Sequence, residues 1–161
     1  MEAPIDIKIF LPHRPPMLMV DMISHIDDER VDTYFELKPD NIFISNGTLC
    51  EAGLIENAAQ TCSAIVAKDY FVDENNESRD GVKVIGFISA LKSMRILALP
   101  EVGTTITTRA ALMSKFQTEE YTLCTMSCRT FSGETLLIEG EINLIIREVA
   151  AEAEPENGIS I

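Results

Sequence analysis

The alternation of apolar and polar positions is clearest in residues 30–37. Every second residue from Val31 to Leu37 falls on one side of the chain, and Asp32 and Glu36 fall on the other. A period of two is typical of a strand with one buried face. With turn signals such as Ser132-Gly133 between them, we predict further strands at residues 17–22, 82–90, 91–97, 104–113, 121–131 and 135–146. In residues 121–131 one face would carry Thr122, Cys124, Met126 and Cys128.

A different pattern occupies residues 49–70, where small residues alternate with Leu and Ile on several faces. This composition predicts a long helix that other backbone approaches from several sides, so that it is enclosed rather than lying on a surface. Thr48 and Glu51 have the spacing of a capping box at its start. Glu56 and Gln60 are four residues apart and therefore share one helix face.

One long helix followed by four or five antiparallel strands predicts an α+β fold, with the central helix wrapped by a curved antiparallel sheet. We expect one domain over residues 1–150, a polar surface loop at residues 73–81, and a disordered acidic tail at residues 151–161. Such a sheet leaves an edge and an apolar flank unpaired. Pairing of two such edges would remove both, which predicts a homodimer or a higher oligomer of dimers.

Charge and composition narrow the possible functions. The chain has 161 residues, 46% of them hydrophobic, and a formal net charge of -13. This charge disfavours binding to nucleic acid or to anionic membranes. The apolar stretches are too short to span a bilayer, and no N-terminal apolar run has the basic flank of a secretory signal, so we expect a soluble, cytoplasmic protein. The four cysteines fit a reducing compartment, and since no histidine lies near them in sequence we expect no metal site.

His13 and Glu56 are the candidate acid–base pair. His13 lies between prolines, and Glu56 lies in an otherwise apolar helix, where it would be desolvated and available as an acid. The alternatives are that His13 only bonds backbone at a proline corner and that Glu56 pairs with Lys92 or Arg95. Gln60 could orient Glu56 or only satisfy backbone groups across a dimer. The other histidine, His25, borders an acidic turn and is expected at the surface, and Arg14 is expected to be solvated or salt-bridged.

An ordered series of motifs resembles the bacterial β-hydroxyacyl-ACP dehydratases of the hot-dog fold. Leu11-Pro12-His13-Arg14 and the Pro-Met-Leu-Met-Val-Asp that follows at residues 16–21 are similar to that family's L-P-H-R…P-F-L-L-V-D opening. Further matches are Asp-Asn-Ile-Phe at residues 40–43, the helix motif at residues 53–60, Gly86-Phe87 through Lys92, and Pro-Glu-Val-Gly at residues 100–103.

One departure separates this chain from that family. The family's G-H-F-P motif, whose histidine abstracts the substrate α-proton, corresponds here to residues 45–51, which contain no histidine. The chain therefore looks like the divergent dehydratase-like proteins of aryl-polyene and flexirubin-type pigment pathways. The resemblance implies dehydration of a β-hydroxyacyl thioester, carried on ACP or CoA, in fatty-acid or polyene-type lipid biosynthesis, without a metal or organic cofactor.

In that reaction Glu56 and His13 would be catalytic, and Gln60 would bind the substrate hydroxyl or orient Glu56. Arg14 could meet the acidic surface of the carrier protein. A backbone N–H near Gly86, or one at the helix N-terminus, would polarise the thioester carbonyl. Two alternatives remain. One is a hot-dog acyl thioesterase in which Glu56 activates water. The other is a non-catalytic partner that binds acyl chains or completes a heterodimer.

Overall fold

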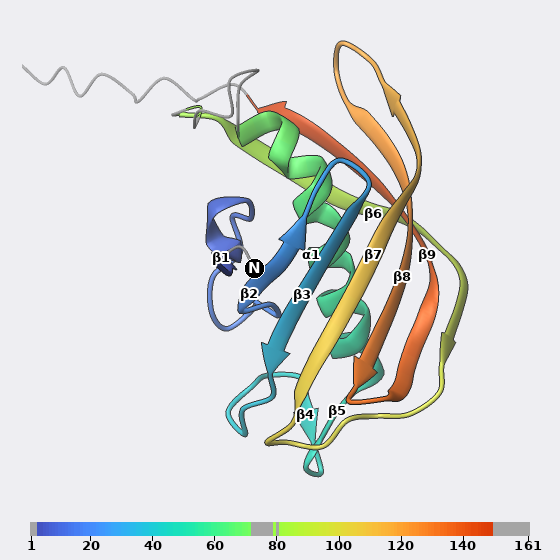
Figure 1. Ribbon diagram of the computed structural model, residues 1–161. Helices are drawn as coiled ribbons and strands as arrows, with labels where there is room; N and C mark the ends of the chain where they lie inside the picture. The colour runs from blue at the N-terminus through green and yellow to red at the C-terminus, as the bar shows by residue number, and fades with distance from the viewer. Residues whose placement is uncertain (1–2, 72–78, 80, 150–161) are drawn as a thin grey trace, which may run out of the picture.

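A seven-stranded antiparallel sheet curves around a single long helix in the computed structural model (Figure 1). The structure describes residues 3–71, 79 and 81–149. The elements are β1 (Ile5–Asp6), the 3-10 turn η1 (Ile7–Ile9), β2 (Met22–Ile26), β3 (Arg30–Glu36), β4 (Ile44–Ser45), β5 (Thr48–Leu49), α1 (Glu51–Phe71), β6 (Lys83–Ile96), β7 (Thr105–Gln117), β8 (Thr122–Ser132) and β9 (Thr135–Val149). The strand order is β1-β2-β3-β7-β8-β9-β6, and β4 and β5 form a separate hairpin. The predicted α+β class, a central helix wrapped by an antiparallel sheet, is confirmed.

The inner face of the sheet packs on α1. Thr122, Cys124, Met126 and Cys128 of β8 are all buried there, as the alternation predicted. In β3, Thr33 is buried and its hydroxyl bonds the hydroxyl of Thr61 on α1, at 2.7 Å. Small residues on α1, among them Ala58, Ala64 and Ala67, are buried in the same core. The predicted enclosure of this helix is therefore confirmed along most of its length, and the side chains left partly open form a narrow strip that includes Glu56.

Two strand predictions are wrong. Residues 17–22 do not form a strand, because β2 begins only at Met22. The backbone of Met17 and Met19 instead hydrogen-bonds side chains of α1. The predicted strands at residues 82–90 and 91–97 are one strand, β6, which stays paired with β9 through register shifts between Ile88 and Ala90 and between Lys92 and Arg95. These bulges bend the strand without ending it.

The predicted capping box is also wrong. Thr48 belongs to β5, and its hydroxyl donates to the Ser45 carbonyl at 3.2 Å instead of accepting from the helix. The Leu54 amide donates to the Cys50 carbonyl, so the helix begins at Glu51. Asn46 and Gly47 both have positive φ, 51° and 80°, which is the geometry of a tight two-residue hairpin turn. A β-hairpin therefore takes the residues that would have capped the helix.

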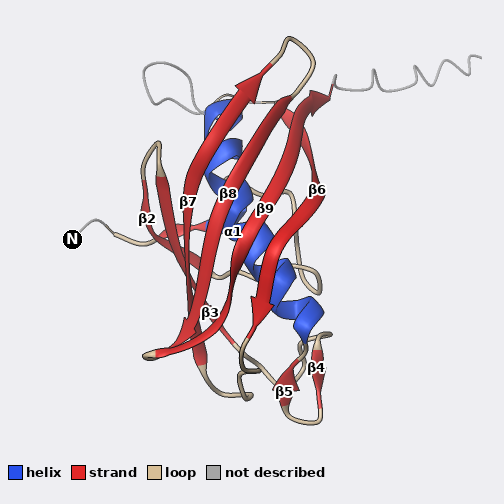
Figure 2. Cartoon of the chain, turned by 90° about the vertical axis from the view of Figure 1, so that its right-hand side faces the viewer, coloured by secondary structure: helices blue, strands red, loops and turns tan. Residues whose placement is uncertain are grey.

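Strand β6 forms one edge of the sheet (Figure 2). Several of its apolar side chains are exposed: Ile85, Phe87, Ile88, Leu91 and Ile96. Among residues 3–71, 79 and 81–149, no helix has the length and apolar character needed to cross a bilayer. The predicted disordered tail at 151–161 lies outside the described residues, as does most of the predicted loop at residues 73–81.

Candidate active site

The side chain of Gln60 forms hydrogen bonds to Glu56 and to the chain segment that crosses α1 beside it. Its Nε2 donates to Glu56 Oε1 and to the Met17 carbonyl, both at 2.7 Å, and its Oε1 accepts from the Met19 amide at 2.8 Å. Glu56 and Gln60 are one helical turn apart on α1, so the amide reaches both the carboxylate beside it and the chain that crosses the helix. Gln60 thus bonds the Glu56 carboxylate and also satisfies backbone groups, which belong to the same chain and not to a dimer partner as the alternative had it.

Asn57 holds the same crossing segment at a second point. Its Nδ2 donates to the Met19 carbonyl at 2.7 Å, and its Oδ1 accepts from the Thr108 hydroxyl at 2.6 Å. Asn57 is buried. The sequence reasoning above did not include Asn57 or Thr108, although an asparagine within an alanine-rich helix is a signal that could have identified this contact. Together, Asn57 and Gln60 fix residues 17–19 against α1.

This attachment brings His13 to the helix. His13 Nε2 lies 3.9 Å from Glu56 Oε1, which is too long for a hydrogen bond but close enough for both groups to contact one ligand. The side chains remain 36% and 24% exposed, respectively. Glu56 is thus less enclosed than the helix composition predicted, because it lies on the strip of α1 that the chain leaves partly open. Arg14 Nη1 donates to the carbonyls of Leu11 and His13, at 2.9 and 2.7 Å, so Arg14 braces the corner.

The Nδ1 atom of His13 is buried and has no hydrogen-bond partner in the part of the chain that the structure describes. An imidazole that accepts or releases a proton at Nε2 must keep a hydrogen on Nδ1. A buried N–H without an acceptor costs about 1–3 kcal/mol. Of the two candidates, Glu56 is therefore the better supported within a single chain, since Gln60 fixes its orientation.

The ion pairs considered for Glu56 do not form. Arg95 lies in β6 and pairs with Glu139 at 3.2 Å, and Lys92 lies opposite Glu141 in the β6–β9 register. His25 lies at the surface, as predicted, with its side chain 43% exposed. Its Nε2 lies 2.8 Å from Asp27 Oδ2, a contact that the sequence did not predict. Amide hydrogen bonds from Glu29 and Arg30, with the His25 contact, lower the pKa of Asp27 to about 2.

The remaining predicted groups lie elsewhere. Gly86 is in β6 opposite Ile146, and within the described residues no hydrogen bond connects it to Glu56 or Gln60. The segment without the family histidine, residues 45–51, forms the β4–β5 hairpin and the start of α1. The cysteines are free thiols, and Cys62 is fully buried. A hydrogen bond with Cys128 and burial raise the pKa of Cys62 well above its ordinary value, so this thiol is a poor nucleophile.

Glu56 and His13 are two partly exposed titratable groups beside one another. A carboxylate held by an amide and an imidazole a short distance away can together handle two protons of one substrate. No organic cofactor is needed for such a transfer.

Comparison with solved structures identifies the fold. A chain of the dehydratase heterocomplex ApeI:P from Xenorhabdus doucetiae aligns with a TM-score of 0.71 at 19% identity, over 89% of this chain and 91% of that one. Cj0977, a sigma28-regulated virulence protein from Campylobacter jejuni, aligns with a TM-score of 0.60 at 15% identity, over 84% and 81%. A hypothetical thioesterase with coenzyme A from Streptococcus pneumoniae gives 0.52 at 11% identity, over 77% and 83%. These likenesses show the hot-dog fold.

No curated protein matches the sequence. The profile of one family does match, described as ApeP-like, ApeP dehydratase, and the match runs over residues 5–154. This range contains the crossing segment, the helix with Glu56 and Gln60, and all seven strands of the sheet. The chain is therefore a member of the ApeP-like dehydratase family.

Proposed function

We propose that this protein dehydrates β-hydroxyacyl thioesters to trans-2-enoyl thioesters, using Glu56 and His13. The observation that carries the proposal is the oriented Glu56 carboxyl group, bonded by Gln60 and 3.9 Å from His13 Nε2. The substrate would arrive on the phosphopantetheine arm of an acyl carrier protein or of CoA, in a lipid or polyene biosynthetic reaction. Membership in a dehydratase family supports the reaction class.

The reaction needs two proton movements on neighbouring carbons. A base removes the proton on the carbon next to the thioester carbonyl, and an acid protonates the hydroxyl on the next carbon. The electrons of the C–H bond form the C=C bond, the C–O bond breaks, and water leaves. His13 Nε2 would take the first proton and Glu56 would give the second, so the protein returns to its starting state once a proton passes back from His13 to Glu56.

The spacing of the two groups suits this assignment. The α-carbon and the hydroxyl oxygen of the substrate are two bonds, or about 2.5 Å, apart. Two catalytic atoms separated by 3.9 Å can face these two positions from the same side. A backbone N–H at the start of α1 or near Gly86 would polarise the thioester carbonyl and stabilise the enolate as it forms. Gln60 acts on the substrate only through Glu56 in this proposal, because its Nε2 and Oε1 are already bonded to Glu56, Met17 and Met19.

A second chain would complete the site. The open edge of β6 carries exposed apolar side chains, of which Phe87 is 52% and Leu91 43% exposed. An unpaired, apolar edge strand of this length pairs readily with another strand. Pairing two copies along β6 would bury this edge and add a wall beside α1, excluding water from Glu56. We therefore include a homodimer, paired through β6, in the proposal.

The second candidate is a dehydratase partner without catalytic activity of its own. Two observations favour it: the segment at residues 45–51 has no histidine, and His13 Nδ1 has no acceptor among the residues that the structure describes. The similar solved chain comes from a heterocomplex named for two components, ApeI and P. In this case a different hot-dog chain would pair with β6 and supply a histidine. A thioesterase with Glu56 activating water is the third reading, suggested by the fold neighbour that is a hypothetical thioesterase.

The reaction products distinguish the three candidate functions, which are dehydratase, non-catalytic partner and thioesterase. Purified protein is incubated with β-hydroxyacyl groups on ACP and on CoA, and the products are separated by mass. A loss of water with the thioester intact supports the dehydratase, whereas a free acid supports the thioesterase. If the protein alone forms neither product but stimulates a second dehydratase chain, the non-catalytic partner is the correct function and the dehydratase proposal fails.

A further inference from the structure

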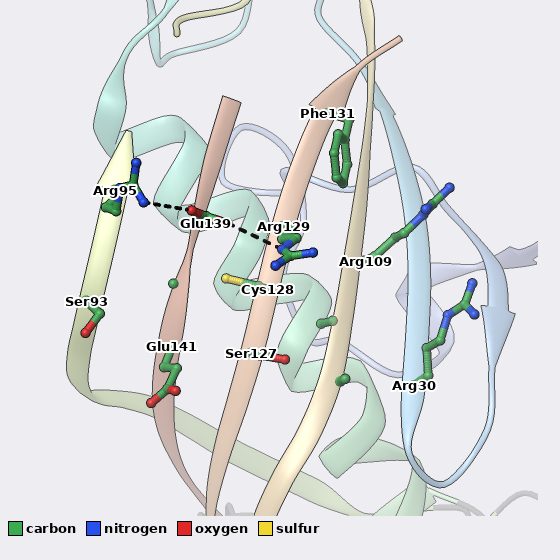
Figure 3. Close-up of a pocket in the computed structure, with 13 residues that line it drawn as sticks. Arg30, Ser93, Arg95, Arg109, Ser127, Cys128, Arg129, Phe131, Glu139 and Glu141 are labelled. Atoms are coloured by element: carbon green, nitrogen blue, oxygen red, sulfur yellow. Dashed lines mark hydrogen bonds and ion pairs between the residues drawn. The ribbon is translucent and has the colours of Figure 1, made fainter. Parts of the chain in front are cut away.

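Arg14 differs in its contacts from the arginines on the face of the sheet that points away from α1. There, Arg95 and Arg129 share the carboxylate of Glu139, at 3.2 and 3.4 Å, as Figure 3 shows. The sequence contains 26 aspartates and glutamates. In the part of the chain that the structure describes, Arg14 nevertheless forms no ion pair. Its guanidinium is bonded to the backbone instead.

A single nitrogen of Arg14 bonds two carbonyls beside the candidate base. Nη1 donates to the Leu11 carbonyl at 2.9 Å and to the His13 carbonyl at 2.7 Å. This nitrogen carries two hydrogens, so it can serve both acceptors at once, and hydrogen bonds from a charged donor are stronger than neutral ones. The Leu11 side chain is buried in the core that also contains the small residues of α1. The Leu11 carbonyl is therefore a fixed point to which the backbone of His13 is tied.

Few backbone torsions stay free between the two bonded carbonyls. Pro12 lies between them, and its ring fixes its own φ. The soft torsions that remain are ψ of Pro12 and φ and ψ of His13, and the two bonds to Nη1 close a ring that constrains them together. The Cα atom of His13 lies in this ring and carries the imidazole. The ring thus sets the direction in which Nε2 points, toward Glu56 Oε1 at 3.9 Å.

The backbone of Arg14 connects the same corner to the segment that crosses α1. Its carbonyl accepts from the Met17 amide at 3.0 Å. The Met17 carbonyl in turn accepts from Gln60, the side chain that orients Glu56. Arg14 therefore lies between the two candidate catalytic groups in a continuous set of hydrogen bonds, and its guanidinium holds His13 at one end of that set.

We infer that Arg14 is a positioning residue for His13, and that its guanidinium fixes the imidazole in the direction that proton transfer requires. The inference rests on the proposed function, in which His13 Nε2 takes the α-proton. Displacement of a reacting group by about 1 Å can lower a rate by about a hundredfold, so the clamp affects the chemical step. This role differs from contact with an acidic carrier protein, for which the charge of Arg14 alone would be sufficient.

The imidazole signals in NMR spectra test the position of His13 without any need for turnover. The chain has two histidines, and His25, at the surface beside Asp27, is the internal reference. Arg14→Met keeps a long side chain without donors and should shift and broaden the His13 signals while those of His25 stay in place. Lys38→Met removes a cation from an exposed position after β3 and should change neither set.

Folding of each variant is verified by circular dichroism. Arg14→Lys is prepared as well, and it replaces Arg14→Met in both experiments if that variant does not fold. Lysine keeps the charge, but its side chain is one bond shorter and lacks the planar guanidinium. It should therefore fail to restore the His13 signals of the wild type.

Kinetics separate positioning from carrier docking. The substrates are a β-hydroxyacyl group on ACP and the same group on pantetheine alone. Arg14→Met should lower kcat by about tenfold on both, with KM within about a factor of two of the wild type. Arg14→Lys should also stay low. In the double variant with His13→Ala, Arg14→Met should cause no further loss, because it acts through His13.

Three results would overturn the inference. The first is an unchanged set of His13 signals in Arg14→Met, whatever the turnover. The second is a loss confined to the ACP substrate and absent in Arg14→Lys, because Arg14 would then serve the carrier through its charge. The third is a further loss in the double variant. If the wild type forms no enoyl thioester, the proposed function fails, and the imidazole signals alone decide whether Arg14 positions His13.

Discussion

Gln60 donates a hydrogen bond to Glu56 across one turn of α1, at 2.7 Å. The same amide nitrogen holds the carbonyl of Met17, and the amide oxygen accepts from Met19. The side chain that orients the carboxylate therefore also attaches the segment that follows His13. Any change at Gln60 should disturb both halves of the site together.

Replacing Gln60 with methionine tests this coupling. Gln60→Met keeps the volume of the side chain but leaves the Met19 amide and the Met17 carbonyl without partners, which should cost about 3 kcal/mol of unfolding free energy. Displacement of Glu56 and His13 should lower kcat by about a hundredfold. Chemical denaturation and steady-state kinetics measure the two effects. A variant that loses stability while kcat is unchanged would show that Gln60 only supports the backbone.

Asn57 should affect stability more than chemistry. Asn57→Ala removes the partner of the Met19 carbonyl and one partner of the Thr108 hydroxyl, and should destabilise the fold by about 2 kcal/mol. Ser63→Ala on the same helix is the control, because Ser63 only bonds the Ala59 carbonyl one turn back. Urea denaturation of both variants checks the difference. If Asn57→Ala and Ser63→Ala have equal unfolding free energies, the hydrogen bonds of Asn57 contribute no more to stability than hydrogen bonds to water would.

Two glycines allow a matched comparison. A Cβ on Gly53 would lie 2.7 Å from Phe43 Cβ and from Leu49 Cδ1, so Gly53→Ala must displace the β4–β5 hairpin from α1 and should cost about 2 kcal/mol. A Cβ on Gly86 would lie 3.5 Å from Ile146, an ordinary contact. Thermal unfolding should therefore separate Gly53→Ala from Gly86→Ala.

Steady-state kinetics of Gly86→Ala test whether Gly86 takes part in the reaction. If the Gly86 backbone approaches the thioester, as proposed, Gly86→Ala should raise KM or lower kcat while its unfolding midpoint stays near that of the wild type. Wild-type kinetics in Gly86→Ala would remove Gly86 from the site and leave the start of α1 as the carbonyl-binding group.

Periodicity identified the elements that depend on local pattern. The alternation in residues 30–37 located β3, and the small-residue composition located α1 to within two residues at each end. The start of β2 was not predictable in this way, because the hydrogen bonds that keep residues 17–19 out of the sheet come from side chains about forty residues away. The helix start was misjudged for a related reason, since Thr48 bonds Ser45 in a hairpin.

In the candidate site, too, the local contacts were predictable from the sequence and the long-range contacts were not. The spacing of four residues was enough to place Glu56 beside Gln60 on one helix face. The approach of His13 to Glu56 depends on the long-range bonds of Asn57 and Gln60, which no local pattern encodes. The burial of His13 Nδ1, with no hydrogen-bond partner in the described part of the chain, is likewise a property of packing.

The most direct test of the proposed function is dehydration by Glu56→Gln, compared with wild type and with Glu51→Gln. Both variants make the same change on α1, but the Glu51 side chain is exposed in the first turn, and Glu51→Gln leaves the backbone N–H groups there in place. The amide cannot protonate a leaving hydroxyl, so Glu56→Gln should lower enoyl thioester formation by at least about a hundredfold, and Glu51→Gln should retain the wild-type rate. His13→Ala should also lose activity, by a smaller factor. Enoyl formation by Glu56→Gln at the wild-type rate would contradict the assignment of Glu56 and, with it, the proposed mechanism.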